Sequence, residues 1–419
     1  MKISTAKMIA ERIESGDLLA FGYVHSGFEP LFKSLNEFAR SRDVDVFIHC
    51  VLRYTSEYLF PLDRIAPHFG GRFLITQIAP EQAGLLTGGN VDILPLPLSQ
   101  VQRYLKESLR KRRVWLFSEI SPPDGRGLCN TGYSALFPLS LYPECICVGL
   151  VNDKMPPTFG DTSLRAETFQ YFVEMPSGLP FYPEPALTDA MMRAGQNAAH
   201  LIDEGATIQT GMGEVPYAVL RALSGRKNLR FQSGILPEEV MALIEEGCFT
   251  GKACCNVTNA RSGRFYDWLK LNPAVEIRSL DYTHDVNLMS QQHGFTSINS
   301  AICVDLFGQV VLETLGSRQI SGIGGALDYA RASGNGNGKS IIAMTSTYGE
   351  ENRTKIVPLL NSGEIVSLTR HDVNYVVTEF GVAELRHRSR QERARNLISV
   401  AHPKHREDLM RRAREIRLI

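Results

Sequence analysis

Short apolar runs rich in β-branched and aromatic residues alternate with segments of helical periodicity along the chain. LLAFGY, DVFIHC, RFLITQI, VWLFSEI and CICVGLV have the character of buried strands, whereas FEPLFKSLNEFARS and SQVQRYLKESLRK carry apolar residues at helical spacing. A helix between two strands returns the chain so that the strands can pair in parallel. The alternation therefore predicts an α/β fold with open, mainly parallel sheets.

The chain has 419 residues, which is more than one typical hydrophobic core accommodates. Its densest proline cluster is PSGLPFYPEP, at residues 176–185, and a proline-rich stretch of this kind is typical of a linker. We therefore predict one α/β domain over residues 1–180 and a second over residues 186–419.

The two halves begin alike. IESGDLLAFG, at residues 13–22, aligns without gaps with IDEGATIQTG, at residues 202–211. Each reads as a helix end, a glycine C-cap, a strand and a glycine at the carboxyl end of the strand. Duplication of one α/β domain explains this match better than chance similarity between two βα units. Ligands of open α/β sheets bind at such strand ends.

Composition excludes several classes of partner. Lysine plus arginine and aspartate plus glutamate both number 45, so the balance favours neither nucleic acid nor a membrane surface. The eight cysteines form no C-x-x-C pair, and no histidine cluster lies near them at zinc spacing, so we expect buried free thiols and no metal. The amino terminus lacks the apolar core of a signal peptide, and no run is long enough to span a bilayer. These features predict a cytoplasmic protein.

A first glycine loop, TGMGE, contains Gly211, Met212, Gly213 and Glu214 and is followed by Val215. It follows a predicted strand and opens a helix, where backbone N–H groups can hold an anion. It is neither the dinucleotide-binding fingerprint nor a Walker A loop. An anion site and a plain tight turn both fit it.

A second glycine loop begins in SGIGGALDYARAS, where Gly322, Gly324 and Gly325 precede a polar-apolar run. A Gly-Asn-Gly-Asn-Gly tract then leads to Lys339 and a predicted strand. Glycines allow a ligand to approach the backbone closely, and Lys339 offers a positive charge for a phosphate. A flexible hairpin explains residues 335–338 equally well, but it explains the first glycines poorly.

Other nucleophile systems are weak in this sequence. No G-x-S-x-G motif is present, and the histidines are dispersed, so carboxylates are the remaining candidates. In SGILPEEVMAL, Glu238 and Glu239 follow Pro237 and precede an apolar run. A proline at the first helical position with acids in the first turn is an ordinary helix start. The pattern alone leaves open whether either carboxylate reacts.

Several runs together carry a family resemblance. They are EGATIQTGMGEVPYAVLRAL, TSINSAICVDLFGQV, SGIGGALDYARASG, GKSIIAMTST, KIVPLL, DVNYVVTEFGVAELR and ERARNLISVAHPKHRE, with looser matches in SGFEPL, EISPPDGRGLCNTG and MPPTFGD. The chain resembles the acetyl-CoA hydrolase/transferase family, which includes 4-hydroxybutyrate, acetate, butyrate, succinate and itaconate CoA-transferases. The runs stand in family order over nearly the whole chain, so the resemblance implies two similar domains of the CoA-transferase type and homo-oligomers.

The resemblance also implies a mechanism. A glutamate of the family attacks an acyl-CoA thioester and, through an anhydride, becomes a glutamyl-CoA thioester, from which an incoming acid takes the CoA. The Gly-Ile-x-x-Glu context of that glutamate matches GILPE and selects Glu238. Backbone N–H near Gly325 and the side chain of Asn299 are candidates for the oxyanion hole, although Asn299 also suits a turn at a strand start.

Coenzyme A, as acyl-CoA, and a small carboxylic acid are the ligands that the resemblance implies, with no metal. The loop from Gly211 to Val215 and the region of Gly324, Gly325 and Lys339 are expected to contact CoA. The turn at residues 27–30 is expected on the acyl side.

The sequence departs from the family immediately before the nucleophile. Leu236 and Pro237 stand where family members commonly have His-Ser or His-Thr. Glu238 therefore has unusually apolar neighbours, which bears on acyl specificity and on activity. A transferase is the favoured interpretation. An acyl-CoA hydrolase on the same fold and a non-catalytic CoA-binding paralogue are the alternatives.

Overall fold

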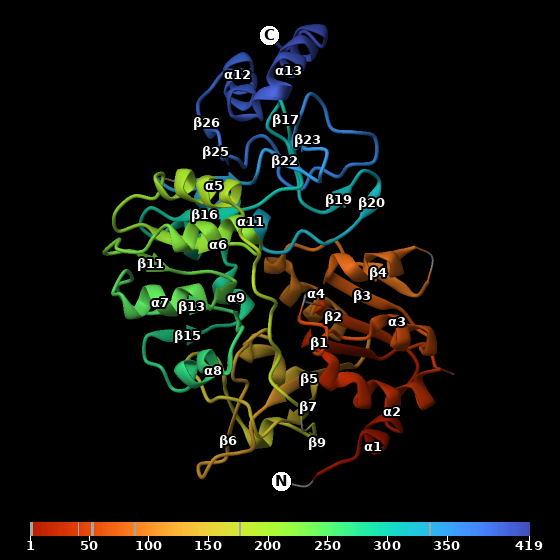
Figure 1. Cartoon of the computed structure of the whole chain (residues 1–419). Coiled ribbons are helices and arrows are strands. Elements are labelled where there is room, and N and C mark those ends of the chain that lie inside the picture. The colour runs from red at the N-terminus through yellow and green to blue at the C-terminus, as the bar shows by residue number, and fades with distance from the viewer. Residues whose placement is uncertain (1–2, 41, 52–53, 88, 176, 335–336) are drawn as a thin grey trace. The chain divides into compact units, whose positions relative to one another are not determined.

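The structure is a computed structural model that describes residues 3–40, 42–51, 54–87, 89–175, 177–334 and 337–419. Pro176, at the start of the predicted linker, lies outside the described residues, as do Asn335 and Gly336 in the glycine-asparagine tract. Figure 1 shows the course of the chain and labels its elements.

The chain forms two compact units. The first contains residues 1–183, 254–283 and 320–324, and the second contains residues 184–253, 284–319 and 325–419. The carboxyl half thus supplies two segments to the first unit. The domain boundaries at residues 180 and 186 stay a prediction.

The main sheet of the first unit has seven strands, all paired in parallel. Their order across the sheet is β4 (Val91–Ile93), β3 (Phe73–Ile78), β2 (Asp45–Val51), β1 (Leu18–Val24), β5 (Val114–Ile120), β7 (Ile146–Val151) and β9 (Tyr171–Glu174). All five runs predicted as strands are strands of this sheet, which confirms the predicted parallel α/β architecture.

The main sheet of the second unit has six strands. Their order is β11 (Arg230–Phe231), β10 (Thr207–Thr210), β16 (Thr296–Asn299), β21 (Lys339–Ala343), β25 (Tyr375–Thr378) and β26 (Gly381–Glu384). Only the last pair, β25 with β26, is antiparallel.

In each main sheet, later strands are added on both sides of the strand that comes first in the sequence. In the first unit β1 pairs with the next strand, β2, on one edge and with the later strand β5 on the other. In the second unit β10 pairs in the same way with β11 and with β16. Such an arrangement is a topological switch point, where connections leave in opposite directions and keep the carboxyl ends of the strands accessible. The shared order is what duplication of a domain predicts.

The repeated segments match in conformation as well. The strands β1 and β10 begin at the aligned residues Leu18 and Thr207. The aligned Gly16 and Gly205 both have positive φ, 91° and 74°. The predicted C-cap role of these glycines is wrong, because the preceding helices end several residues earlier and the glycines lie in turns. Gly22 lies inside β1 rather than at its end.

The helices are α1 (Ala6–Ala10), α2 (Glu29–Ala39), α3 (Leu62–Ile65), α4 (Val101–Leu109), α5 (Asp189–Ala199), α6 (Glu214–Arg221), α7 (Glu239–Glu245), α8 (Gly263–Leu269), α9 (Leu280–Thr283), α10 (Val286–Ser290), α11 (Ala326–Ser333), α12 (Arg390–Val400) and α13 (Pro403–Glu415). Short 3-10 helices are η1 (Ser26–Phe28), η2 (Ala66–His68), η3 (Pro80–Leu86), η4 (Leu98–Gln100), η5 (Leu139–Glu144) and η6 (Ala166–Thr168). Both helices predicted above are present, as α2 and α4.

The remaining strands are short. They are β6 (Leu128–Asn130), β8 (Ser163–Arg165), β12 (Ile235–Pro237), β13 (Ala253–Cys255), β14 (Val257–Asn259), β15 (Val275–Ile277), β17 (Cys303–Asp305), β18 (Val310–Val311), β19 (Thr314–Leu315), β20 (Arg318–Gln319), β22 (Thr347–Tyr348), β23 (Arg353–Thr354) and β24 (Ile356–Val357).

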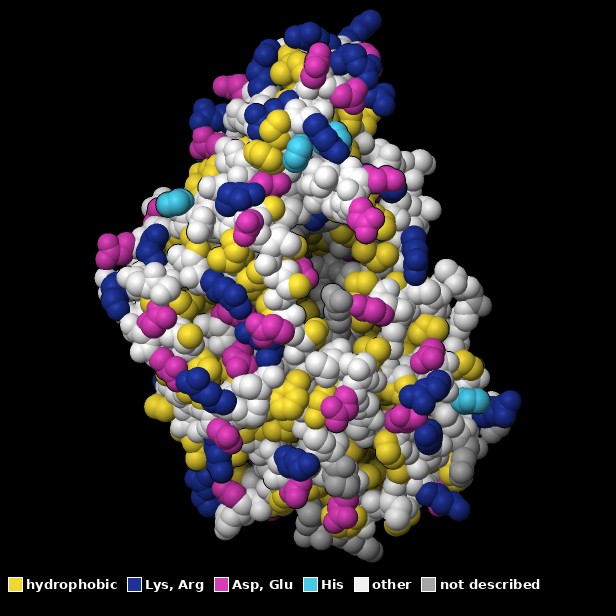
Figure 2. All heavy atoms as spheres, in the orientation of Figure 1, with side chains coloured by type: hydrophobic (Ala, Val, Ile, Leu, Met, Phe, Trp, Pro, Cys, Tyr) yellow, Lys and Arg dark blue, Asp and Glu magenta, His cyan; other side chains and the backbone are white. Residues whose placement is uncertain are grey.

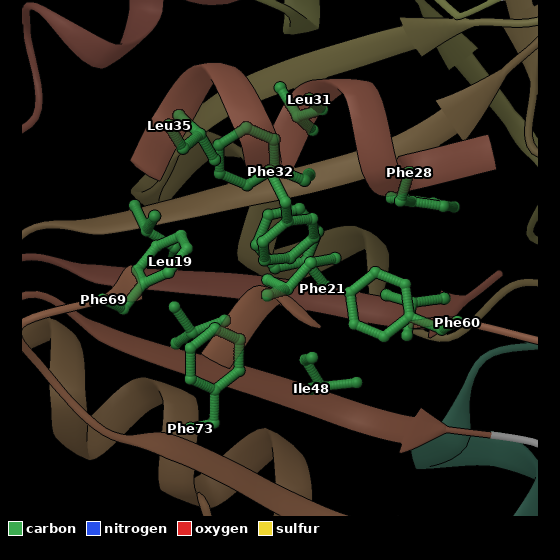
Figure 3. Close-up of a cluster of buried hydrophobic side chains, with 14 of the residues drawn as sticks. Leu19, Phe21, Phe28, Leu31, Phe32, Leu35, Ile48, Phe60, Phe69 and Phe73 are labelled. Atoms are coloured by element: carbon green, nitrogen blue, oxygen red, sulfur yellow. The ribbon is translucent and has the colours of Figure 1, made fainter. Parts of the chain in front are cut away.

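An aromatic cluster fills the core of the first unit between the sheet and α2 (Figure 3). Phe21 of β1 stacks on Phe117 of β5, with ring centroids 4.4 Å apart, and also contacts Phe32 of α2 at 4.7 Å. The helix presents Leu31, Phe32 and Leu35 to the sheet because these positions fall on one helical face. In the second unit α12 and α13 bury apolar residues against β21, β25 and β26.

Phe21→Ala should lower the free energy of unfolding of the first unit by about 3–5 kcal/mol, because it leaves a cavity in a fully buried cluster. Both tryptophans, Trp115 and Trp268, lie in this unit, so tryptophan fluorescence during urea unfolding reports on it. Phe159→Ala is the control, because Phe159 is 43% exposed and should change stability by less than about 0.5 kcal/mol. Equal effects of the two substitutions would contradict this account of the core.

Candidate functional site

The first glycine loop lies at the switch point of the second unit. It leaves β10 at Thr210, and Gly213 has φ 124°, a conformation that side chains rarely adopt, immediately before α6. The strand β16 ends alongside it at Asn299. The Gly211 N–H donates to the Ile298 carbonyl at 2.8 Å, and a Cβ on Gly211 would lie 2.5 Å from Asn299 Oδ1. The structure thus brings Gly211 and Asn299 together.

The other loop residues differ in exposure. Met212 is 36% exposed, whereas Val215 is buried in the first turn of α6, which Glu214 begins. Asn299 is 7% exposed, and its amide pairs with that of Gln209. Gln209 Nε2 donates to Asn299 Oδ1 at 3.4 Å, and Asn299 Nδ2 donates to Gln209 Oε1 at 3.3 Å. This pairing orients the amide against the glycine loop.

Glu238 is carried to its position by a segment attached to the same strand end. The chain leaves β11, which is parallel to β10, and passes through Ser233 and β12 to Glu238. Ser233 Oγ donates to the Thr210 carbonyl at 3.0 Å. The segment that bears Glu238 is therefore hydrogen-bonded to the start of the glycine loop.

Glu238 is half-buried and is the N-cap of α7, and Glu239, at 9% exposure, is its first residue. The predicted place of Pro237 at the first helical position is wrong, because the extended conformation of β12 continues through Pro237. Leu236 is fully buried. The apolar pair before Glu238 thus belongs to the protein interior.

The glycines of the second loop pack closely against other residues of the protein. In the first unit, a Cβ on Gly322 would lie 1.8 Å from the Thr76 carbonyl oxygen, and one on Gly324 would lie 2.0 Å from Gln77 Nε2. In the second unit, a Cβ on Gly325 would lie 2.6 Å from His284 Nε2. Close packing on the protein itself therefore requires these glycines, and Gly324 and Gly325 belong to different units.

Lys339 is not brought together with the first glycine loop. It begins β21, and its register partner in β16 is Thr296, at the amino end of that strand. Its Nζ lies 2.7 Å from Asp203 Oδ2 and 2.7 Å from the Leu201 carbonyl oxygen. Lys339 thus lies at the amino ends of the strands, whereas Gly211 and Asn299 lie at the carboxyl ends.

Sequence reasoning missed Lys355, which lies within electrostatic range of Glu214 in the first glycine loop. Its backbone N–H donates to the Ser346 carbonyl at 2.9 Å, and Ser346 in turn donates to Glu379, which follows β25. Burial lowers the pKa of Lys355, while Glu214 and Glu379 act to raise it. Its run, KIVPLL, had served only for the family resemblance.

A buried histidine–glutamate pair lies at the switch point of the first unit and was also missed. His25, directly after β1, is fully buried, and its Nε2 lies 3.3 Å from Glu119 Oε2 at the end of β5. The Gly27 N–H donates to His25 Nδ1 at 3.1 Å. Tyr133 Oη and Asn152 Nδ2 each donate to Glu119 at 2.7 Å.

A cavity of about 550 Å³ lies beside this pair in the first unit. The turn at residues 25–30 lines it together with Lys33, Tyr58, Lys154 and Ser177. These side chains are mostly polar, so the cavity suits a small polar molecule better than an alkyl chain.

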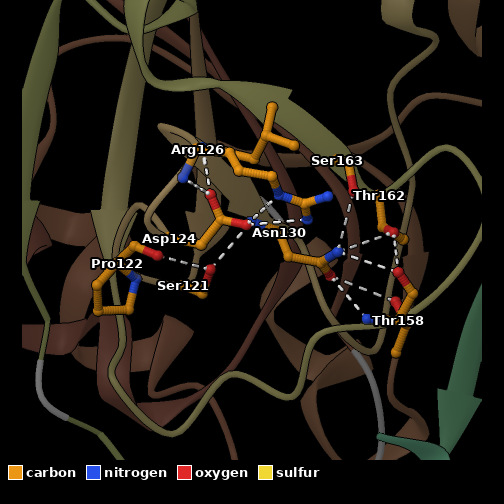
Figure 4. Close-up of polar contacts among 9 residues, drawn as sticks. Ser121, Pro122, Asp124, Arg126, Asn130, Thr158, Thr162 and Ser163 are labelled. Atoms are coloured by element: carbon orange, nitrogen blue, oxygen red, sulfur yellow. Dashed lines mark hydrogen bonds and ion pairs between the residues drawn. The ribbon is translucent and has the colours of Figure 1, made fainter. Parts of the chain in front are cut away.

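A polar network in the same unit holds the runs CNTG and PPTFGDTS together (Figure 4). Asn130 Nδ2 donates to the Thr158 carbonyl at 3.0 Å and to Thr162 Oγ1 at 3.2 Å, and Asn130 Oδ1 accepts from the Thr158 N–H. Nearby, Asp124 accepts from the N–H of Arg126 and closes a turn. These runs of the resemblance therefore have a structural role in the segments that follow β5 and β7.

Comparison with known proteins shows the family. Residues 262–413 match the acetyl-CoA hydrolase/transferase C-terminal domain. A 4-hydroxybutyrate coenzyme A transferase of Clostridium kluyveri is 34% identical, over 98% of this chain and 96% of that protein. The chain belongs to the acetyl-CoA hydrolase/transferase family. A CoA transferase of Fasciola hepatica, succinyl-CoA:acetate/propanoyl-CoA:succinate, is 32% identical over 93% of this chain and 84% of its own length.

A solved structure agrees with the family fold. RipA from Yersinia pestis matches with a TM-score of 0.87 at 24% identity, over 100% of this chain and 98% of that chain. The predicted family, fold class and enzyme class, a CoA-transferase, are thereby confirmed. The site residues stay predictions.

The cysteines are in the state that the sequence predicted. All eight cysteines are buried free thiols, and burial raises the pKa of Cys147 to about 12, so the reactive thiolate is disfavoured. Within the described ranges, no group of three or more His, Cys, Asp or Glu side chains has a metal-binding arrangement. The helices described there also include none that is long and apolar enough to cross a membrane. Figure 2 shows acidic and basic side chains interspersed on the visible face.

Glu119→Gln should destabilise the first unit by roughly 1–3 kcal/mol at pH 7, because it removes a buried carboxylate that is hydrogen-bonded to His25, Tyr133 and Asn152. Burial alone would raise the pKa of Glu119, but the interaction with His25 and the hydrogen bonds from Asn152 and Tyr133 outweigh burial and hold the pKa below its ordinary value. The ionised form therefore contributes stability above about pH 4.3 that is lost as pH falls through the folded-state pKa.

The difference between wild type and Glu119→Gln should accordingly shrink as pH falls below about 4.3 in urea unfolding followed by tryptophan fluorescence. Glu107→Gln is the control, since Glu107 is exposed and pairs with Arg103 on the surface of α4. A difference that is constant with pH would contradict the role assigned to the Glu119 carboxylate.

Proposed function

We propose that the protein transfers CoA from an acyl-CoA to a short-chain carboxylic acid, with Glu238 as the nucleophile. The observation that carries the proposal is the attachment of the Glu238 segment to the glycine loop, through Ser233 and Thr210, at the switch point of the second unit. The relationship to CoA transferases of C. kluyveri and F. hepatica supports it. Acids of the 4-hydroxybutyrate, itaconate, succinate, butyrate or acetate type are the proposed acceptors.

The reaction proceeds by acyl exchange on one carboxylate. A Glu238 oxygen attacks the thioester carbonyl, and the C–S bond breaks. CoA departs as the thiolate, and the acyl group remains on Glu238 as a mixed anhydride. The thiolate then attacks the Glu238 carbonyl and releases the acyl group as a free carboxylate, which leaves a glutamyl-CoA thioester. An incoming carboxylate reverses these steps. No general base is needed, because glutamate is ordinarily ionised at neutral pH.

A carboxylate is a poor nucleophile, so the rate depends on alignment and on charge stabilisation. Backbone N–H groups from Gly211 to Val215, at the start of α6, are proposed to hold an anionic group of CoA. The Gly325 N–H and the Asn299 amide are proposed to stabilise the oxyanion. The positions of Gly324 and Lys339 give no support to their predicted contacts with CoA, and Lys355 is the cation near the loop.

The alternative activity within the family is hydrolysis of acyl-CoA, in which water resolves the glutamyl thioester. The matched family description covers both hydrolases and transferases. CoA release that requires a carboxylic acid indicates transfer, whereas release without one indicates hydrolysis. CoA binding with no adduct would indicate a non-catalytic paralogue. A panel of acetate, butyrate, 4-hydroxybutyrate, succinate and itaconate against acetyl-CoA and succinyl-CoA would identify the acid.

Glu238→Ala should lower exchange of CoA by at least about 10⁴-fold, because it removes the carboxylate on which the proposed covalent intermediate forms. Wild-type protein incubated with acyl-CoA and then with borohydride or hydroxylamine should carry one modified glutamate, located by mass spectrometry. Glu239→Gln is the matched control, since the neighbouring acid begins α7 and should retain exchange. Modification of another residue, or full exchange by Glu238→Ala, would overturn the assignment.

A further inference from the structure

Two glycine turns of the second unit rest on one buried pair of side chains. His284, at 1% exposure, lies just before α10, and Tyr329, at 3% exposure, lies on α11. Tyr329 Oη and His284 Nε2 are 3.0 Å apart, and their ring centroids are 4.9 Å apart. The tyrosine ring also packs on Phe295 in a small apolar cluster that joins α10 and α11. The pair is thus fixed from both helices.

Gly234 and Gly325 both approach this pair closely. A Cβ on Gly234 would lie 2.9 Å from Tyr329 Oη and 3.0 Å from His284 Nε2. A Cβ on Gly325 would lie 2.6 Å from His284 Nε2 and 2.8 Å from Tyr329 Cε2. Such distances are shorter than real Cβ contacts, so neither turn tolerates a side chain unless the pair moves.

We propose that His284 and Tyr329 are positioning residues, a hydrogen-bonded spacer that sets the separation between the turn leading to Glu238 and the turn at Gly325. This inference rests on the proposed function, in which Glu238 is the nucleophile and the Gly325 N–H serves the oxyanion. Gly234 precedes Glu238 by four residues, and the three extended residues of β12 transmit its position. Ser233, hydrogen-bonded to Thr210, fixes the other side of the turn.

The geometry explains why the pair is polar. Close packing already holds buried rings in place, and a hydrogen bond between the two rings adds a directional restraint on their separation. A displacement of about 1 Å in a reacting group can lower a rate by about 10²-fold. A spacer between nucleophile and oxyanion donor should therefore act on the chemical step rather than on binding of acyl-CoA.

Tyr329→Phe removes the hydroxyl that faces Gly234 and breaks the bond to His284. We expect the single-turnover rate of glutamyl-CoA formation to fall about tenfold, with the KM for acyl-CoA changed less than about twofold. Tyr142→Phe is the matched control. Tyr142 is a buried tyrosine of the first unit whose hydroxyl lies 3.0 Å from Ser118 Oγ, and its loss should leave the rate unchanged.

A second variant adds a methyl group at Gly234, which faces the Tyr329 hydroxyl. Gly234→Ala should lower the same rate by about 10²-fold, since its Cβ displaces the pair or the turn. In the double variant, Gly234→Ala with Tyr329→Phe, the added methyl faces no hydroxyl, so the rate should exceed that of Gly234→Ala alone. Thermal unfolding of each variant separates loss of folded protein from loss of rate.

Additive effects in the double variant, or a wild-type rate in Tyr329→Phe, would overturn the spacer. A loss of thermal stability with unchanged rate per folded molecule would also overturn it, because the pair would then only stabilise the fold. Failure of the proposed function has a different signature, namely adduct formation on a residue other than Glu238 or none in wild type.

Discussion

Each main sheet depends on one strand that is hydrogen-bonded on both edges by parallel strands from different parts of the chain. In the second unit this strand is β10, and in the first it is β1. The connections that lead to the strands on its two sides therefore run in opposite directions, and the carboxyl ends of the strands remain accessible. Polar side chains occupy both places, Asn299 beside the glycine loop in one unit and Glu119 with His25 in the other. The topology, rather than any local motif, assembles these groups.

Local periodicity was sufficient to predict five strands of the first sheet and the helices α2 and α4, because the spacing of apolar residues is visible over short stretches of sequence. Predicting which side chains meet at the carboxyl ends of the strands required knowledge of the strand register and of contacts distant in sequence. Lys339 follows a glycine tract and looked suited to a phosphate, yet the register of β21 places it at the amino edge, where it pairs with Asp203. Lys355 had no local signal. Glu119 was interpreted as part of a strand and of a run of the family resemblance, since its partner His25 is distant in sequence and meets it only in the folded unit.

The two glycine loops show the same limit in another form. A glycine indicates that something approaches the backbone closely or that φ is positive, but the sequence does not say what approaches. Gly213 has positive φ at the start of α6, where a helix dipole favours an anion. Gly322 instead accommodates the Thr76 carbonyl, and Gly325 accommodates His284. Similar glycine clusters therefore have different causes, and only the tertiary contacts distinguish them.

Leu236 and Pro237, which stand before Glu238 where the resemblance implies His-Ser or His-Thr, fit a proposed site that relies on rigidity. Leu236 is fully buried, and an unpaired polar side chain there would cost roughly 1–3 kcal/mol. Proline restricts the backbone next to the proposed nucleophile and lowers the entropy lost on ordering it. A carboxylate reacts slowly unless it is held in line with its target. A buried, restrained approach to Glu238 would therefore serve the proposed chemistry through alignment.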